Sequence, residues 1–245
     1  MTLIKTEALI LRTVPYQESS KIVRMFTREQ GKIAVIAKGS RRIKSGFRGL
    51  LEPLNHIETI YYYKSTRDVQ TLSNIELLNS FLASVASMES TILGMALLEI
   101  IDKIVHDHQH DSEIFDSAIT HLKTMEANPD NCKFVFIRFL QNLAEILGYR
   151  LNVETCHRCR AALLDSAFYD PVNAILLCAD CGQHLSSGHR LSKHDLTFLT
   201  KPIIADVGPL ITEEKLRRLF IHYLSYHLDS ALELKSLRML SSLKM

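Results

Sequence analysis

Four cysteines in two pairs are the residues of this sequence whose spacing points most directly to chemistry. Cys156 and Cys159 form one CxxC pair, and Cys178 and Cys181 form a second pair after 18 intervening residues. Two such turns at this separation are typical of a structural zinc site, in which each turn presents two thiolates to one tetrahedral ion. The sequence therefore predicts one structural Zn²⁺ bound by these four cysteines. Unmetallated thiols are the alternative.

The same pattern argues against catalysis at the metal. Four thiolates would fill the coordination sphere and leave no open position for water or a substrate. A haem-attachment site needs His directly after a CxxC pair, a zinc deaminase needs an HxE segment before PCxxC, and neither occurs here. The sequence also has no P-loop, dinucleotide fingerprint or nucleophile elbow. We therefore expect a protein that is not an enzyme.

A second functional pattern is the run of positive charge over residues 21–48. It holds nine Lys or Arg residues against one carboxylate, in a chain whose net charge is only +2. Cations on the phosphates and aromatic faces for the bases are the two ingredients of single-strand nucleic-acid binding. The candidate phosphate-binding residues are Lys21, Arg24, Lys38, Arg41, Arg42, Lys44 and Arg48. A solvated charged face without a ligand is the alternative.

Aromatic residues near this run could stack on bases. They are Phe26, Phe47 and the run Tyr61–Tyr63. Successive strand residues point to opposite faces, so at least one of the three tyrosines is expected to pack inward, and stacking by any one of them stays open. The HxHxH pattern over residues 106–110 lies at a predicted helix end beside two aspartates. An exposed polar loop is favoured there over a metal site.

The elements that position the basic run are predicted strands over residues 3–14, 21–27, 31–39, 53–64 and 69–77. Their alternating apolar residues and the turn at Gly31 indicate hairpins. Five short strands with little helix between them predict a small closed β-barrel. An OB-fold, which binds single-stranded nucleic acid, is preferred over an SH3-like barrel.

The pattern becomes helical from about residue 80. Apolar residues at three-and-four spacing predict helices over residues 80–108, 112–126, 132–147, 192–200 and 212–243. The prediction is an α+β multidomain chain, with a five-stranded OB-fold barrel over 1–79 followed by an all-helical domain over 80–245. The zinc module lies at about 153–185 in this scheme. The sequence shows no signal peptide and no membrane-spanning run, so a cytoplasmic protein with reduced thiols is expected.

Residues 4–42, IKTEALILRTVPYQESSKIVRMFTREQGKIAVIAKGSRR, resemble the N-terminal barrel of the RecO family of bacterial DNA-repair and recombination mediator proteins. The matching features are the opening strand, the YQESSK turn, the TREQGKI hairpin and the AKGSRR loop. Many family members carry a four-cysteine insertion in the helical domain. The segment HYLSYHLDSALELKSLRML is similar to the C-terminal close of the family.

The resemblance implies a protein that binds single- and double-stranded DNA, anneals complementary strands and helps load a recombinase onto DNA coated by single-strand-binding protein. It implies as partners a RecR-type mediator protein and the C-terminal tail of single-strand-binding protein. That tail would bind a basic, apolar pocket on the helical domain, for which Lys133 and Arg138 are candidates. The implied location is the bacterial cytoplasm, at the nucleoid. An RNA-binding protein, or a zinc-stabilised structural adaptor without annealing activity, is the alternative.

Overall fold

The structure is a computed structural model that describes residues 2–81, 88–185, 188–201 and 213–242. The strands are β1 (Thr2–Tyr16), β2 (Ser20–Thr27), β3 (Gly31–Ala37), β4 (Asn55–Tyr63), β5 (Val69–Ser80), β6 (Ser166–Asp170), β7 (Ile175–Leu177) and β8 (His189–Ser192). The helices are α1 (Met88–Ile104), α2 (Ser112–Ala127), α3 (Cys132–Ile146), α4 (Ala179–Gly182), α5 (Lys193–Thr200), α6 (Glu213–His227) and α7 (Lys235–Ser242). Within the described ranges no helix is long and apolar enough to cross a membrane.

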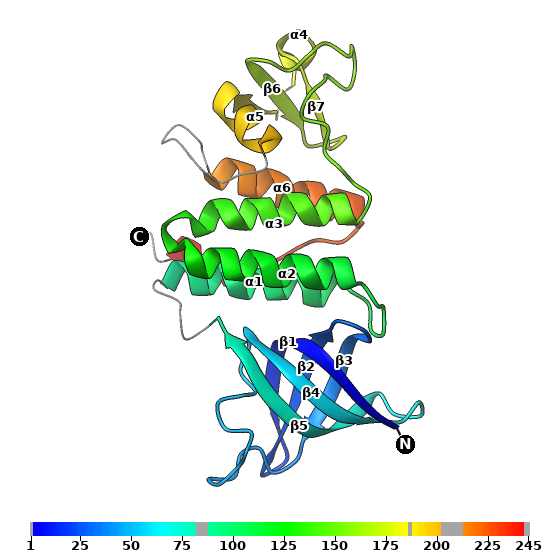
Figure 1. Cartoon of the computed structure of the whole chain (residues 1–245). Coiled ribbons are helices and arrows are strands. Elements are labelled where there is room, and N and C mark those ends of the chain that lie inside the picture. The colour runs from blue at the N-terminus through cyan, green and yellow to red at the C-terminus, as the bar shows by residue number, and fades with distance from the viewer. Residues whose placement is uncertain (1, 82–87, 186–187, 202–212, 243–245) are drawn as a thin grey trace. The chain divides into compact units, whose positions relative to one another are not determined.

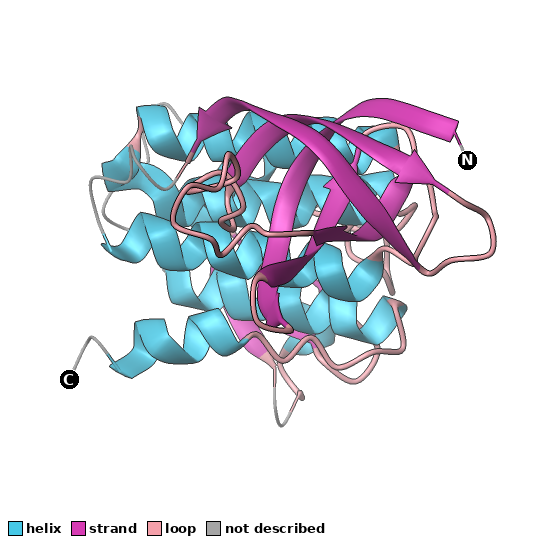
Figure 2. Cartoon of the chain, turned by 90° about the horizontal axis from the view of Figure 1, so that it is seen from below, coloured by secondary structure: helices cyan, strands magenta, loops and turns pink. Residues whose placement is uncertain are grey.

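The first five strands close into a barrel in the order β1-β2-β3-β5-β4, with β4 paired back to β1 (Figures 1 and 2). β3 and β5 pair in parallel, and the other neighbours are antiparallel. This closed five-stranded order is that of an OB-fold, so the OB prediction is confirmed over the SH3-like alternative. The strand ends agree with the sequence prediction within a few residues, because alternating apolar residues mark the inward face.

The barrel interior is filled by the inward-facing residues of all five strands. Val23 and Met25 of β2 and Ile57 and Tyr61 of β4 belong to this buried cluster. Tyr61 is fully buried and Tyr62 is exposed. The expectation that one tyrosine of the run packs inward is therefore confirmed.

The described chain divides into two compact units. One comprises residues 1–129 with 234–245, and the other comprises residues 130–233. The barrel shares the first unit with α1, α2 and α7; the Phe26 and Phe115 rings, for example, meet edge to face at 5.7 Å. Packing of α1 and α2 on the barrel explains why this division falls at residue 129. The predicted boundary after residue 79, one residue before the end of β5, stays a prediction.

The second unit joins a helix pair to a small sheet. α3 packs against α6, and the sheet has the order β7-β6-β8. α5 begins with a capping box in which Ser192 accepts a hydrogen bond from the N–H of Asp195 at 3.2 Å, while the Asp195 carboxylate accepts one from the N–H of Ser192 at 2.8 Å. The region after the barrel is thus helical as predicted, with three short strands in its cysteine-bearing segment.

Two helix predictions need correction. For the predicted helix over 80–108, Ser80 ends β5, residues 82–87 lie outside the described ranges, and α1 ends at Ile104. The predicted helix over 212–243 is two helices, because α6 ends at His227 and Asp229 adopts φ 47°. At the end of α6, the carbonyl of Ser225 accepts a hydrogen bond from the N–H of Ser230 at 3.2 Å. No Gly or Pro marks this break in the sequence.

Candidate metal centre and nucleic-acid interface

The four predicted metal ligands come together in the second unit. Their sulfur atoms all lie within 4.8 Å of one another, and the Sγ atoms of Cys159 and Cys178 are 3.6 Å apart. A tetrahedral Zn²⁺ with Zn–S bonds of about 2.3 Å separates its sulfurs by about 3.8 Å. The donor set and its spacing therefore fit one zinc-sized ion. The geometry establishes a group of four cysteines that could bind a metal ion. That this metal is zinc stays a prediction.

Two short turns, joined by a hairpin, present the thiols. In the first turn the N–H of Cys156 donates to the carbonyl of Ala161 at 2.8 Å, and Arg160 takes the left-handed conformation with φ 64°. The chain then runs through β6 and β7, which are paired. The second turn is the start of α4, where Cys178 is the N-cap. At the end of α4, Gly182 leaves no room for a Cβ, which would lie 2.5 Å from the Cβ of Phe168.

The metal-free thiols differ in how readily they ionise. Burial opposes ionisation of Cys156, but hydrogen bonds from backbone N–H groups, those of Cys159 and Cys178 foremost, outweigh it and lower its pKa to about 6. Loss of hydration and then the neighbouring thiols raise the pKa of Cys181 to about 12. Because a metal binds thiolates, loading this site would release protons. A bound zinc would supply folding energy here and no open coordination position.

The basic loop, residues 38–49, lies in the connection between β3 and β4 and carries five of the seven predicted phosphate-binding residues. All five are exposed: Lys38, Arg41, Arg42, Lys44 and Arg48. Within the described ranges, none of the five has a carboxylate at ion-pair distance. Figure 1 shows this loop at the end of the barrel away from α1 and α2. These cations are available to an external anion.

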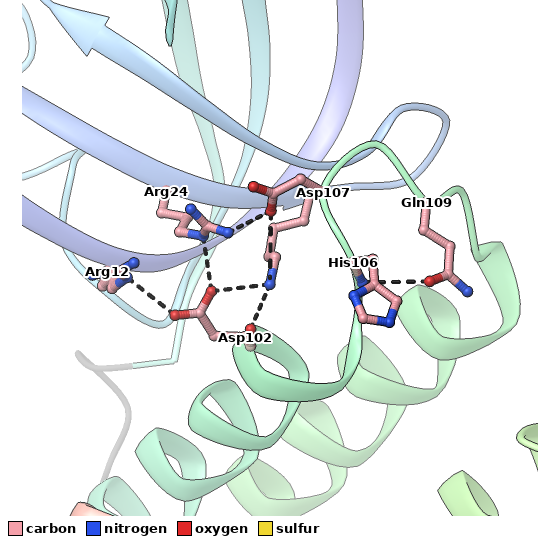
Figure 3. A network of polar contacts seen from close by, with 7 residues as sticks. Arg12, Arg24, Asp102, His106, Asp107 and Gln109 are labelled. Carbon is pink, nitrogen blue, oxygen red and sulfur yellow. Dashed lines mark hydrogen bonds and ion pairs between the residues drawn. The ribbon is translucent and has the colours of Figure 1, made fainter. Parts of the chain in front are cut away.

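The other two predicted residues, on β2, have partners within the chain. Lys21 forms an ion pair with Glu52 at 3.0 Å. Arg24 forms ion pairs with Asp102 of α1, at 2.9 Å, and with Asp107 in the α1–α2 connection (Figure 3). Their role in phosphate binding stays a prediction, and a phosphate at Arg24 would have to compete with two carboxylates.

Asp102 is the centre of a charge cluster that the sequence analysis missed. Its carboxylate also binds Arg12 of β1 at 3.0 Å (Figure 3). It binds Lys32 of β3 at 3.4 Å as well, and Lys32 donates to the backbone carbonyl of Asp102. Lys32 is only 4% exposed, and burial lowers its pKa. In the sequence, Lys32 looks like one more cation of the basic run. The sequence around Lys32 gives no sign that it contacts Asp102, which comes 70 residues later.

The histidines of residues 106–110 lie in the exposed connection between α1 and α2. Of the described His, Cys, Asp and Glu side chains, only the four cysteines gather closely enough to hold a metal ion. The N–H of His108 donates to the carbonyl of Lys32 at 3.0 Å, so this connection caps the edge of β3. An exposed polar loop was the favoured interpretation, and burial and contacts agree with it.

Arg138, a candidate for binding an acidic tail, uses its guanidinium within the second unit. The group lies 4.0 Å above the centroid of the Phe198 ring, and it donates to Gln141 Oε1 at 2.8 Å and to the carbonyl of Phe198. Burial lowers the pKa of Arg138. These contacts indicate a structural role in joining α3 to α5. A role in tail binding stays a prediction for Arg138, as it does for Lys133.

Comparisons with known proteins agree along the chain. Residues 1–81 match the family model "Recombination protein O N terminal", and residues 86–238 match "Recombination protein O C terminal". A "DNA repair protein RecO" of Salinibacter ruber is 32% identical over 150 residues, which span 60% of this chain and 56% of that relative. Proteins of the same name match more of the chain. The one of Chloroherpeton thalassium is 28% identical over 90% of this chain and 86% of its own length, and the one of an Exiguobacterium species is 27% identical over 98% and 96%.

Proposed function

Because this chain belongs to the recombination protein O family of DNA repair proteins, we propose that it binds single- and double-stranded DNA during recombinational repair. The observation that carries the proposal is the basic loop of the OB-fold barrel, whose five exposed cations have no carboxylate at ion-pair distance in the described chain. Each cation can displace a condensed counterion from a DNA phosphate, which favours binding at low salt. Lys21 and Arg24 are secondary contacts in this proposal.

Annealing of complementary strands follows from the same electrostatics. Two single strands repel each other through their phosphates, and a cluster of cations that holds one backbone reduces this repulsion while the base edges stay free to pair. The protein would then help load a recombinase onto DNA coated by single-strand-binding protein. A RecR-type mediator and the C-terminal tail of single-strand-binding protein are the proposed partners. This substrate would place the protein in the bacterial cytoplasm, at the nucleoid.

The protein is proposed to act without catalysing a covalent reaction. Four cysteines around one Zn²⁺ form a closed coordination sphere, and such a metal stabilises a fold. The site supports a structural zinc that holds the two cysteine turns together. The second unit would then serve partner binding and not chemistry.

The test is fluorescence anisotropy with a labelled single strand, over a salt series from about 50 to about 500 mM. The loop variant carries Arg41→Ala, Arg42→Ala, Lys44→Ala and Arg48→Ala. We expect its affinity to fall sharply and the slope of log K against log salt to shrink by about 0.7 for each phosphate that the variant no longer binds. The matched control loses the same charge at four exposed cations of the second unit, as Arg150→Ala, Lys193→Ala, Lys201→Ala and Arg218→Ala.

Equal binding by wild type and the loop variant at every salt concentration would contradict the proposed interface. An equal loss of affinity in the control variant would show that only net charge matters. Competition between DNA and RNA oligonucleotides of one sequence separates DNA repair from the RNA-binding alternative. Annealing of two complementary strands, followed by stopped-flow mixing, then tests the activity itself, and the loop variant should anneal more slowly.

A further inference from the structure

Ile43, at the tip of the basic loop, is exposed to an unusual degree for its type. Its exposed fraction is 88%, higher than that of any other large apolar side chain in the part of the chain that the structure describes. Scattered apolar residues on a surface need no explanation by themselves. Here the residue stands directly between Arg42 and Lys44, so that an apolar group and two exposed cations share one loop tip.

The loop holds this tip in a defined place through successive turns. The N–H of Arg42 donates to the carbonyl of Gly39 at 3.1 Å, and the N–H of Ser45 donates to the carbonyl of Arg42 at 3.0 Å. On the far side of the tip, Phe47 packs against the barrel core. The side chain of Ile43 is thus carried on a backbone that is anchored before and after it. A ligand would meet a preformed projection, which lowers the entropic cost of binding it.

The start of the loop is anchored to the neighbouring turn as well. The N–H of Arg41 donates to the carbonyl of Ser19 at 2.9 Å, and its guanidinium donates to the carbonyl of Gln17 at 3.1 Å. Residues 17–19 form the turn between β1 and β2. The cationic tip therefore projects from two connected turns at one end of the barrel.

Because the loop tip is positively charged, its favoured ligand is a nucleic acid, whose phosphates are negatively charged. Cations on both sides of Ile43 would contact phosphates, and these contacts would bring its exposed apolar side chain close to the bound strand. Proteins that deform DNA insert side chains of this kind, Ile among them, between neighbouring bases. The insertion costs stacking energy and gains apolar contact with the base faces.

We propose that Ile43 is an apolar wedge that inserts between neighbouring bases of DNA bound to the basic loop. This inference rests on the proposed DNA-binding function and assigns one contact within it. Arg42 and Lys44 hold the phosphates on either side, and Ile43 separates two bases. A base unstacked in this way has its pairing edge accessible to a complementary strand, which links the wedge to annealing.

The test uses the full chain and a single-stranded oligonucleotide that carries one 2-aminopurine, whose fluorescence is quenched by stacking. Wild type should raise the fluorescence on binding, and Ile43→Ser should abolish this rise. We expect Ile43→Ser to bind about three- to tenfold more weakly with an unchanged salt slope, because the substitution removes apolar surface and leaves the phosphate-binding cations in place. Ile43→Leu, which keeps an apolar side chain, should restore the signal. Leu3→Ser, at a 57% exposed residue of β1, is the matched control and should behave as wild type.

The outcomes separate the wedge from the DNA interface. An unchanged fluorescence rise in Ile43→Ser, together with a smaller salt slope in the loop variant, overturns the wedge and leaves the interface in place. If Ile43→Ser and the loop variant both show the wild-type rise in fluorescence and the wild-type salt slope, the wedge and the DNA interface are overturned together. A smaller salt slope in Ile43→Ser itself also overturns the wedge, because it would mean that the substitution disturbs the neighbouring cations. Ile43 is exposed, so none of these variants depends on a change in the barrel core.

Discussion

Asp102 is the residue on which three cations of the barrel depend. Its carboxylate contacts Arg12, Arg24 and Lys32, and Lys32 is almost completely buried. Without this carboxylate, the buried ammonium of Lys32 keeps only the more distant Asp107, at 3.8 Å, and the backbone carbonyl of residue 102. Much of the cost of taking its charge out of water is then uncompensated. We therefore expect Asp102→Ala to lower the free energy of unfolding by about 2 to 4 kcal/mol, measured from urea unfolding at fixed pH.

The control for this prediction is Asp116→Ala. Asp116 binds Arg28 at 3.0 Å, but both side chains are about half exposed, and exposed pairs contribute less than about 1 kcal/mol. Both variants remove one carboxylate from the first unit, so they differ mainly in the burial of the partner. Equal losses of stability in the two variants would show that the Asp102 cluster is not a buried network in solution.

His56 is expected to make the barrel less stable in acid. Burial is the main cause that lowers its pKa from 6.5; the nearby carboxylate of Glu7 opposes this shift, and the charges of Lys123 and Arg28 add to it. As the pH falls through about 6.5, the unfolded chain takes up a proton at this position before the folded chain does. Stability is therefore lost as the pH falls, until the folded histidine is also protonated. We expect a lower urea midpoint at about pH 5.5 than at about pH 7.

The variant that isolates this effect is His56→Gln, which cannot become an imidazolium. The difference between its midpoints at these two pH values should be smaller than in wild type, even if the variant is less stable at both. His106→Gln, at an exposed histidine, should keep the full wild-type difference. An unchanged difference in His56→Gln would assign the acid sensitivity elsewhere, for example to His227, whose pKa burial also lowers.

At the level of elements, the turn between β2 and β3 lies tightly against the α1–α2 connection. Gly31 has φ +67°, and a Cβ added there would lie 2.1 Å from the backbone oxygen of Gln109. Gly49 of the basic loop has a similar φ of +75°, with nothing near its Cβ position. Gly49→Ala should cost about 1 kcal/mol for the backbone conformation alone. Gly31→Ala should cost at least about 2 kcal/mol more, because backbone must also move.

This pair of variants separates conformational strain from a steric clash. Thermal or urea unfolding of the two proteins under one set of conditions provides the comparison. If Gly31→Ala were no more destabilising than Gly49→Ala, the turn and the α1–α2 connection would be further apart than the structure has them.

The elements that a local pattern encodes could be predicted from the sequence. Alternation indicated the five strands, because one face of each is buried in the barrel, and the CxxC spacing indicated the four thiols that the structure brings together. The end of α3 is also encoded locally, because Gly148 follows it with φ +83°, a conformation that favours glycine. These signals act over a few residues, and each has a direct physical cause.

Features that depend on distant residues could not be predicted. Arg24 and Asp102 are 78 residues apart, so Arg24 looked as free as Arg42 until the fold brought α1 to β2. The break after His227 has no Gly or Pro; it exists because the chain turns at Asp229 and buries Leu232 and Leu234. In both cases tertiary contacts override a local pattern, and one sequence cannot show such contacts.

At the scale of the whole molecule, the chain leaves the first compact unit and later returns to it. Residues 130–233 form the second unit, and α7 then packs on α1 in the first, where the N–H of Ser236 donates to Glu99 Oε2 at 3.1 Å. The proposed DNA interface and the metal site thus belong to different units. Removal of the metal should affect the unit that contains the cysteines and not the loop that binds DNA.

Removal of zinc tests this division. We expect about one zinc per purified chain under reducing conditions, and its removal by a strong chelator should lower the stability of the second unit, because the metal supplies folding energy to two short turns. Single-strand affinity should change by less than about twofold, since the phosphate contacts that dominate it lie in the first unit.

Cys178→Ser should abolish metal binding, and Cys132→Ser, outside the cluster, should keep it. Metal content, thermal unfolding and anisotropy are measured on the same samples. A metal-free protein that unfolds as the metal-bound one does would remove the structural role, and a large loss of DNA affinity would tie the metal to the interface.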